Sequence, residues 1–391
     1  MEIRVLSGEE EEQAWYVWSQ AFERGDREMR EWREWRATTE DKSVTFGVFD
    51  AAGLQATVLV TDYRIHLGPE VIVPMGGIGG VACLPASRGK GYAGAGLRAS
   101  LEGMREAGQV VSVLFPFSWE YYRRFGWEWV GVNRHYAIPS RVLRPDPETE
   151  NVRAATPADR SAIVGAYTEF AGRYRGMLAR RGRTWAEMLD DKEKEYTYTY
   201  LYEKEGKVEG YLTYRGGKEE GTRLGEFLSL RPRAQRALLG LLRRHDMQIN
   251  KFTWHAPEDD TLWQQYYHWD FETKIQPVTM GRVVDVVGAL QSWRPDRKAG
   301  GVVMLAVQDE HAPWNARTWK VEFAGGEVAV RPAEAAPQVA LDIQALSQAY
   351  FGTPTLDQLR AADRLAVYDE AGYTALRDLL AGPPMWLNDE F

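Results

Sequence analysis

The sequence predicts an α+β protein in which two or three domains combine helices with mixed α/β sheets. Three observations support this prediction. With 391 residues, the chain is long enough for that number of domains, at roughly 100 to 200 residues each. Apolar residues at helical spacing over 8–37 give way over 43–84 to β-rich runs. Polar, proline-containing segments at 144–151 and 292–301 then divide the chain, and each is followed by a new series of helices and strands.

The first third of the chain has the most regular pattern. Two helices are expected within 8–37, and a meander of antiparallel strands over 43–84, separated by the turn signals AAG and LGPE. A glycine-rich turn at Arg88–Gly91 leads into an amphipathic helix that ends near Ala107. The elements expected after it are a strand at 110–117, a short helix around Glu120 and a strand at 127–136.

The middle third repeats this order of elements. The expected elements are a helix after residue 156, strands at 196–202, 207–215 and 223–230, a helix at 233–245 and a strand at 251–255. The run YYRRFGWE at 121–128 is echoed by YYHWDFET at 266–273, and the turn-to-helix junction at Arg88 has a counterpart at Arg231 with nearly the same offset. We infer an internal duplication. The alternative is a chance coincidence of aromatic clusters in a chain rich in Trp and Tyr.

The last third forms a further α+β unit after the second linker. Its expected elements are strands at 302–308, 317–323, 327–332 and 338–343 and two helices around Leu346 and Tyr373. The two linkers therefore predict three domains, with bounds at 1–145, 146–290 and 291–391.

Composition narrows the classes of partner. The formal net charge of −8 disfavours nucleic acid and anionic membranes, because both attract a basic protein surface, and a small neutral or cationic molecule fits better. The single cysteine excludes an intrachain disulfide, and no signal peptide is recognised, so we expect a cytoplasmic protein. No run approaches the roughly 18 apolar residues of a membrane helix. The histidines lack HExxH or related spacing, so no metal site is expected.

The residues best suited to bind a ligand lie at the junction of a strand and a helix, in Arg88–Ala93. Backbone amides at a helix start point outward and the helix dipole favours anions, so this turn suits a pyrophosphate. Gly89 and Gly91 let the backbone approach closely, and Arg88 and Lys90 add charge-assisted hydrogen bonds. The turn has neither the Gly-Lys-Ser/Thr end of a nucleotide-hydrolysing loop nor a GxGxxG run. The alternative is an ordinary glycine turn with solvated basic side chains.

This segment resembles the Arg/Gln-x-x-Gly-x-Gly/Ala signature of the GNAT acetyltransferases, and Tyr-Tyr-Arg-Arg-Phe-Gly-Trp about thirty residues later is similar to their Tyr-x-x-Phe-Gly-aromatic motif. Two motifs in the right order are more specific than either alone. The resemblance implies acetyl-coenzyme A as cofactor. It places the pyrophosphate on Arg88, Gly89, Lys90, Gly91, Tyr92 and Ala93, the pantetheine arm along Val81, Ala82 and Cys83, and Tyr122 beside the thioester sulfur.

The remainder of the chain resembles the enhanced-intracellular-survival acetyltransferases of that superfamily. Gly176–Arg180 with Trp185, and then 278–285, are similar to the middle of those proteins, and 309–319 with 386–391 to their last domain, which is like sterol carrier proteins. The resemblance implies two GNAT-like domains, of which only the first binds the cofactor, and assembly as a hexamer.

The segment of the second copy that corresponds to the phosphate turn supports the expectation that this copy does not bind the cofactor. It reads LRPRAQR over 230–236, without glycine, and Pro232 removes an amide donor. The domains are thus expected to be a catalytic GNAT domain at 1–145, a degenerate copy at 146–290 and a sterol-carrier-like domain at 291–391.

Acetyl transfer to an amine requires a neutral nucleophile, a stabilised oxyanion and a proton for the departing thiolate. The resemblance implies that Tyr122 supplies the proton and that the carboxylate of Phe391, buried against the first domain, is the base. The alternative is that Tyr122 is an aromatic residue of the core. A terminal carboxylate has a pKa of about 3.5 and is a weak base alone; partial burial would raise the pKa, and a water relay could help. Cys83 as a covalent acetyl carrier is disfavoured, because a lone thiol in an apolar run is usually a core residue.

Four residues are candidates for binding an amine substrate through an acidic, aromatic pocket: Asp26, Trp32, Trp35 and Glu390. The alternative for the helix that carries the first three is a solvated face with i,i+4 ion pairs such as Arg27 with Glu31. Two functions remain open. One is an N-acetyltransferase for a small or peptidic amine, such as an aminoglycoside or polyamine. The other is a non-catalytic carrier of an apolar ligand that retains a relic of the transferase domain.

Overall fold

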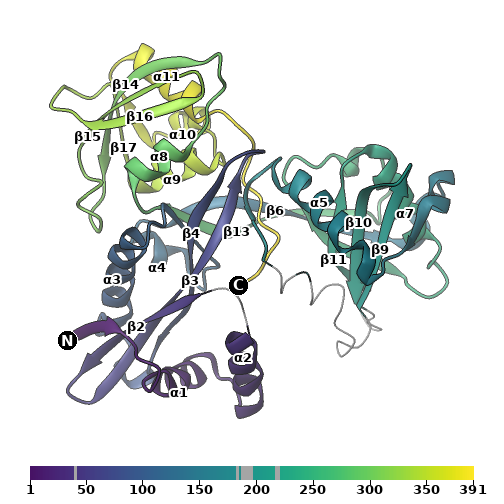
Figure 1. The fold of residues 1–391 in the computed structure, drawn as a ribbon, viewed down its shortest axis with the longest axis horizontal. Coiled ribbons are helices and arrows are strands. Elements are labelled where there is room, and N and C mark those ends of the chain that lie inside the picture. Colours follow the sequence, from purple (N-terminus) through teal and green to yellow (C-terminus); the bar gives the residue numbers. More distant parts are fainter. Residues whose placement is uncertain (39–41, 182–184, 186–196, 216–220) are drawn as a thin grey trace.

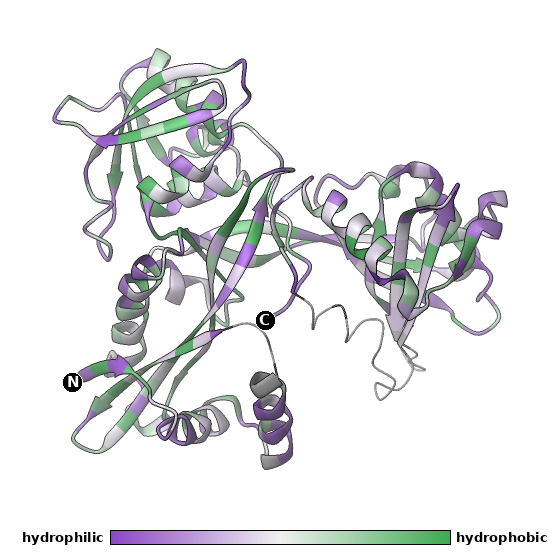
Figure 2. Ribbon diagram, in the orientation of Figure 1, coloured by the Kyte–Doolittle hydropathy of each residue, from purple (hydrophilic) through white to green (hydrophobic). Residues whose placement is uncertain are grey.

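The computed structural model describes residues 1–38, 42–181, 185, 197–215 and 221–391. It has three lobes (Figure 1), and the yellow C-terminal tail descends from the third lobe between the other two. In Figure 2 green apolar stretches run along strands of the sheets, whereas the coloured part of the helix at Asp26–Thr38 is mostly hydrophilic. Within the described residues, no helix combines the length and the apolar character needed to cross a bilayer.

The first lobe is an antiparallel meander with helices on both faces. Its elements are β1 Glu2–Val5, α1 Glu11–Phe22, α2 Asp26–Thr38, β2 Ser43–Asp50, β3 Gly53–Leu67, β4 Ile72–Cys83, α3 Tyr92–Glu106, β5 Val111–Leu114, α4 Trp119–Arg123 and β6 Glu128–Pro139. Strands β1 to β4 pair antiparallel in sequence order, and β5 then lies parallel to β4. Two helices, the meander, the glycine turn and the helix after it were all predicted, and the structure confirms them.

The second lobe repeats the pattern. Its elements are β7 Val152–Ala154, α5 Arg160–Ala171, β8 Arg175–Leu178, β9 Thr197–Lys204, β10 Lys207–Arg215, β11 Thr222–Ser229, α7 Pro232–Arg243, β12 Lys251–Ala256 and β13 Glu272–Val283. Strand β12 lies parallel to β11, as β5 does to β4. The segment 144–151, expected to be a linker, instead forms a 3-10 helix at Pro147–Asn151 that packs on α7, where Thr149 is buried beside Gly240.

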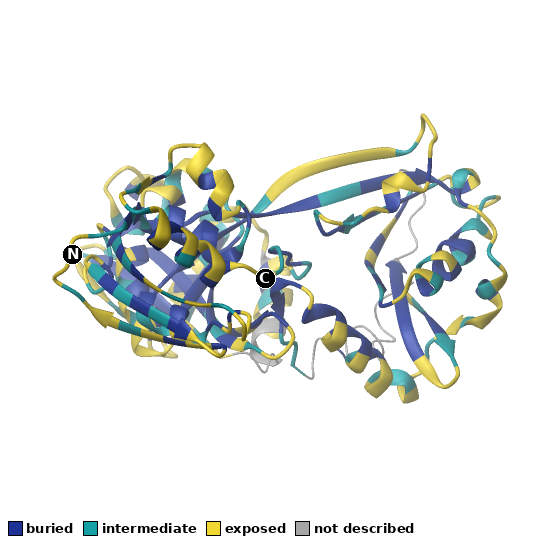
Figure 3. Ribbon diagram, turned by 90° about the horizontal axis from the view of Figure 1, so that it is seen from above, coloured by how far each residue is buried: buried dark blue, intermediate teal, exposed yellow. Residues whose placement is uncertain are grey.

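The two lobes exchange strands, which the sequence did not predict. Strand β13, from the second copy, inserts between β5 and β6 of the first, pairing Gly281 with Val113. Strand β6 extends to pair with β12, opposing Tyr136 to Trp254. Figure 3 shows the paired strands β6 and β13 crossing from one lobe to the other, with the first half of β13 exposed. Among the described residues, one sheet path therefore runs from β1 to β7 through both copies.

The third lobe is an α+β unit packed on the same junction. Its elements are α8 Val286–Ser292, β14 Gly300–Gln308, β15 Thr318–Ala324, β16 Glu327–Pro332, β17 Val339–Asp342, α9 Ile343–Phe351, α10 Leu356–Ala361, β18 Leu365–Val367 and α11 Glu370–Leu380. The sheet order is β16-β15-β14-β17-β18. The four main strands and the helices at α9 and α11 were predicted. The short elements α8, α10 and β18 were not, because three to seven residues carry too little periodicity.

Candidate active site

The candidate site lies where β4 and β5 separate. Their parallel pairing extends only to Ile78 opposite Leu114, where β5 ends, whereas β4 continues to Cys83. Between Gly79 and Ala82 strand β4 has one residue more than β3, a β-bulge with Gly80 at φ 52°. The Gly80 carbonyl accepts hydrogen bonds from Trp18 Nε1 and Thr57 Oγ1, each at 3.0 Å. The splay leaves Val81, Ala82 and Cys83 on a strand end whose far edge has no paired strand in the described structure.

The turn after β4 is anchored at both ends. Ser87 Oγ donates to Gln55 Oε1 at 2.6 Å, and the Tyr92 hydroxyl donates to Asp50 Oδ2 at 2.7 Å. The second hydrogen bond lowers the pKa of Asp50, so its carboxylate stays ionised as an acceptor. These two anchors hold the backbone between them, and sequence reasoning missed them because their partners lie on distant strands.

The turn itself faces open space. Gly89 and Gly91 have φ of 78° and 84°, and a Cβ built at either would meet no atom within 4 Å. Arg88 and Lys90 are exposed on either side of Gly89. Gly91 caps the 15-residue helix α3, whose first turn contains no acidic residue to compete for its amides. The left-handed backbone, the free space and the positive charge suit a diphosphate.

Two further glycines bring α3 close to its neighbours. A Cβ on Gly94 would lie 2.6 Å from the Phe125 ring, and one on Gly96 would lie 2.9 Å from Val58. The glycine-rich sequence of this helix is therefore required by packing as well as by the turn.

Tyr122 is held in a short helix beside the splay. Helix α4 is capped by Ser118, whose Oγ accepts from the Tyr121 amide. The Tyr122 side chain is 3% exposed, and its ring lies 5.2 Å from Phe117 and 5.4 Å from Tyr121. Burial, with a smaller contribution from Tyr121, raises the pKa of the Tyr122 hydroxyl. The hydroxyl therefore keeps its proton at neutral pH.

The thiol of Cys83 is poorly suited to covalent catalysis. The residue is half-buried at the end of β4, and burial raises the pKa of its thiol, a change that Arg88 and Lys90 only partly oppose. A thiol with a raised pKa forms little of the thiolate that is the reactive nucleophile.

The structure brings Phe391 to the same splay. Its ring lies 4.7 Å from the Tyr63 ring on β3 and 5.2 Å from that of Phe115, which directly follows β5. The ring fits because β4 has Gly77 there, where a Cβ would be 2.8 Å from it. Phe117, two residues after Phe115, contacts Tyr122. One short segment therefore contacts both predicted catalytic residues.

The four candidate substrate residues are only partly described. Trp32 is half-buried in a cluster with Trp15 and Trp18, at ring distances of 5.2 and 4.9 Å, so much of its surface serves packing. Glu390 is exposed and lies 3.4 Å from Arg223 of β11. The side chains of Asp26 and Trp35 lie outside the described part of the structure.

The corresponding place in the second copy differs in its chemistry. Helix α7 begins with Pro232, and Arg233 is paired with Glu209 at 2.6 and 2.7 Å. A cleft of about 220 Å³ lies beside this junction, lined by residues that include Arg231, Trp254 and Asp259. Without glycines in the turn and with a carboxylate in the cleft, this place is poorly suited to a diphosphate.

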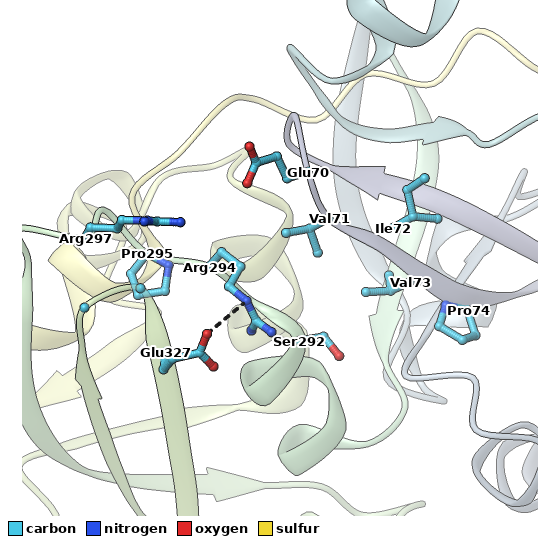
Figure 4. A pocket seen from close by; sticks show the side chains of 12 residues that line it. Glu70, Val71, Ile72, Val73, Pro74, Ser292, Arg294, Pro295, Arg297 and Glu327 are labelled. Atoms are coloured by element: carbon cyan, nitrogen blue, oxygen red, sulfur yellow. Dashed lines mark ion pairs between the residues drawn. The ribbon is translucent and has the colours of Figure 1, made fainter.

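A second cleft, of about 380 Å³, separates the β3–β4 hairpin from the third lobe (Figure 4). Charged side chains line much of it, among them Glu70 and Arg297, and Arg294 lies 3.7 Å from Glu327. Such a lining suits polar rather than apolar ligands. The described residues bring together no group of three or more His, Cys, Asp or Glu side chains that could hold a metal ion.

Three segments match known domain families. Residues 2–130 match an acetyltransferase (GNAT) domain, 176–283 match another acetyltransferase (GNAT) domain, and 286–388 match a sterol carrier protein domain. The two acetyltransferase domains define the chain as an acyltransferase. More specifically, the chain is an N-acetyltransferase that carries two GNAT domains followed by a sterol carrier protein domain.

The similarity to known proteins extends over almost the whole chain. An uncharacterized N-acetyltransferase of Streptomyces avermitilis is 28% identical, covering 93% of each chain. A GCN5-related N-acetyltransferase from Anabaena variabilis superposes with a TM-score of 0.89 at 22% identity, over 100% of both chains. Eis1 from Mycobacterium abscessus does so with a TM-score of 0.80, also at 22% identity and full coverage. At such identities, the likeness to the solved structures is one of fold.

Proposed function

We propose that this N-acetyltransferase uses acetyl-coenzyme A and transfers the acetyl group directly to a primary amine of a small or peptidic substrate. The single observation that carries the proposal is the docking of the Phe391 ring at the β4–β5 splay. The Arg88–Ala93 turn follows the splayed end of β4, and Phe117, two residues after Phe115, contacts Tyr122. The three proposed domains are 1–145 with the site, 146–290 as a degenerate copy and 291–391, which delivers the tail.

The residues of the turn fit the cofactor's diphosphate. Backbone amides from Gly89 to Ala93 and the side chains of Arg88 and Lys90 would hold it, in the open space that the two glycines leave. The unpaired edge of Val81–Cys83 would hydrogen-bond the pantetheine amides as a further strand would. When bound, acetyl-coenzyme A supplies an acyl group activated as a thioester.

The chain's own groups then move the protons. The carboxylate of Phe391 accepts a proton from the attacking amine, directly or through water, and a backbone amide near Cys83 stabilises the developing oxyanion. Tyr122 keeps its proton because burial raises its pKa, and it donates that proton to the departing sulfur. One N–C bond forms as one C–S bond breaks, with no covalent enzyme intermediate.

The acceptor is proposed to be cationic before it reacts, such as an aminoglycoside or a polyamine in the cytoplasm. The exposed carboxylate of Glu390 next to Phe391 and the aromatic face of Trp32 favour an ammonium group, and Asp26 and Trp35 are proposed to contribute from the same helix as Trp32. A panel of polyamines, aminoglycosides and lysine-like amines, assayed for thiol release, would identify the acceptor class.

The base is tested by appending a short Gly-Ser tag after Phe391. The tag removes the carboxylate from the site, so kcat should fall by about 10² to 10⁴, whereas the affinity for acetyl-coenzyme A should change little. The same tag placed before the exposed Met1 is the control. Full turnover by the C-terminally tagged protein would eliminate this base and redirect the search to Asp26 or Glu120.

A homo-oligomer, with a hexamer favoured, is proposed as the assembly. The second lobe exposes large aromatic side chains, with Trp269 100% and Tyr267 87% exposed, and such groups gain free energy when a partner covers them. Light scattering at micromolar concentration should give a mass several times 44.5 kDa, and a monomer would contradict the proposal.

A further inference from the structure

The sequence motif Gly176–Arg180, which the cofactor site leaves unexplained, contacts the C-terminal tail. Arg180 Nε lies 2.8 Å from Asp389 Oδ1, and its guanidinium also pairs with Glu226 of β11. The three side chains are only 3%, 10% and 10% exposed. Tyr167 stacks on the guanidinium, whose carbon lies 4.1 Å from the ring centre. A buried arginine from the second domain therefore holds a carboxylate of the tail.

The backbone of the same segment pairs with the tail as a short strand would. The Arg175 amide donates to the Pro384 carbonyl at 3.0 Å, and the Trp386 amide donates to the Arg175 carbonyl at 2.9 Å. Gly176, at φ 107°, leaves space for Met385, whose sulfur would lie 2.1 Å from a Cβ there. Backbone hydrogen bonds and this close packing thus hold the tail from residue 384 onward.

The other edge of this segment is tied to the sheet of the first domain. Strand β8 pairs with β3, opposing Leu178 to Ile65, and the Ala179 amide donates to the Arg64 carbonyl at 2.8 Å. Arg64 directly follows Tyr63, the residue on which the Phe391 ring rests. The segment therefore connects the tail to the strand on which Phe391 docks.

Arg175, the first residue of the segment, binds the third domain. The fully buried guanidinium of Arg175 donates to the carbonyls of Tyr350 and Leu380, near the ends of α9 and α11, and lies 4.1 Å from the centre of the Trp293 ring. Arg175 fixes the point from which the tail departs, and Arg180 fixes the tail close to its end.

The short spacing between Asp389 and Phe391 means that the contact of Arg180 with Asp389 restricts the position of Phe391. Asp389 is two residues before Phe391, so the two Cα atoms are at most about 7 Å apart even in a fully extended chain. Holding Asp389 therefore restricts Phe391 to a small volume. A buried ion pair is a costly way to gain stability, since well-packed apolar side chains do as well, but it specifies one register.

We infer that Arg175–Arg180, which we call the tail clamp, positions Phe391 for acetyl transfer, with Arg180 and Asp389 as its positioning residues. The inference assigns a role to the second domain, whose own phosphate turn has been lost. Its catalytic part rests on the proposed function of Phe391, whereas the placing of the tail does not.

The test uses the full-length protein with the substitutions Arg180→Met and Asp389→Asn. Carboxypeptidase release of Phe391, followed by mass spectrometry, should become at least about tenfold faster. Because small displacements of a reacting group can cost up to about 10²-fold, kcat should fall by about 10- to 100-fold, with the affinity for acetyl-coenzyme A unchanged. Asp389→Glu, which keeps the charge, should recover part of kcat.

Arg233→Met is the matched control. It removes a second-domain arginine that is paired at 2.6 Å with Glu209 but does not contact the tail, so neither tail release nor kcat should change. Unchanged release in both clamp variants would overturn the inference even if Arg180→Met proved unstable, because Asp389→Asn alters only the tail. Faster release with full kcat would also overturn it.

The tagged protein separates the two failures. If the Gly-Ser tag abolishes turnover while the clamp variants retain it, the positioning role of the tail clamp is wrong, and the Phe391 carboxylate remains the proposed base. If the tagged protein and the clamp variants are all fully active, Phe391 has no catalytic role and both proposals fall. Loss of kcat in the tagged protein and in both clamp variants, together with faster release, is the result expected.

Discussion

The ring of Phe391 lies 4.7 Å from the ring of Tyr63, inclined to it by 44°. The two residues lie far apart in the chain, and the contact places the end of the third domain on the central strands of the first. Tyr63 is 7% exposed, so the docked ring covers a part of the sheet that would otherwise be open. The predictions below concern the groups around this contact.

Gly77→Ala should disturb the docked ring. The new methyl group would lie 2.6 Å from the Tyr63 ring and 2.8 Å from that of Phe391, so one of them must move. We expect a loss of about 1–3 kcal/mol in the free energy of unfolding, as for overpacking elsewhere, and faster carboxypeptidase release of Phe391. Gly79→Ala is the control, since its nearest neighbour would be 3.9 Å away. Equal effects in the two variants would contradict this account.

Gly91→Glu should abolish binding of acetyl-coenzyme A. It adds an anion and a bulky side chain where the diphosphate is proposed to lie, at a backbone φ of 84° that side chains disfavour. Gly91→Ala shares the strain but not the charge, so it should bind more weakly than the native protein yet measurably. Arg231→Glu, in the degenerate copy, should bind normally. Calorimetry on the three variants decides this, and equal loss from Arg231→Glu would show that the second copy binds the cofactor.

Tyr122→Phe should lower kcat by about 10² to 10⁴ without weakening cofactor binding. Burial raises the pKa of Tyr122 above its usual value of about 10, so the acid remains protonated throughout the neutral and mildly alkaline range. Between about pH 7 and 9.5, kcat of the native enzyme should therefore not fall through loss of the Tyr122 proton. The pH profiles of the native enzyme and of Tyr122→Phe should have the same shape in this range. A descending limb in that range that vanishes in the variant would argue against the assignment.

Asp309→Ala should be strongly destabilising. Arg282 Nη2 lies 2.8 Å from both carboxylate oxygens of Asp309, with side chains 0% and 1% exposed, so the variant leaves a buried charge unpaired. We expect a loss of about 3–5 kcal/mol in the free energy of unfolding, measured with denaturant. The double variant Arg282→Met with Asp309→Leu should recover the part due to the unpaired guanidinium, but not the part due to Asn315 Nδ2 and the Ala312 amide, which still lack their acceptor. A loss below about 1 kcal/mol in the single variant would contradict a stabilising role for the pair.

Much of the fold and part of the site were predictable because they depend on local sequence. The strand meander follows from β-rich runs between turn signals, and α3 from its amphipathic spacing. The Arg88–Gly91 turn is recognisable because a positive φ at Gly89 and Gly91 demands glycine. Each of these features is decided by residues within one element or one turn.

The strand exchange was not predictable in this way. Strand β13 is exposed over its first half and buried over its second, and nothing in its own residues says that it inserts between β5 and β6 rather than staying in its own copy. Only its distant contacts reveal the choice. Arg282 fits against Gly126, where a Cβ would lie 1.5 Å from its guanidinium, which explains the glycine of the Phe-Gly-Trp motif.

The sequence by itself determined the α+β class, the repeated order of elements, the glycine turn before α3 and the apolar tail that must dock somewhere, because these follow from periodicity, glycine and burial. The tertiary structure alone decided that Trp32 packs against Trp15 and Trp18, and that Arg180 reaches Asp389. Such pairs lie far apart in the chain, and their meeting depends on how whole domains close on one another, which no short pattern encodes.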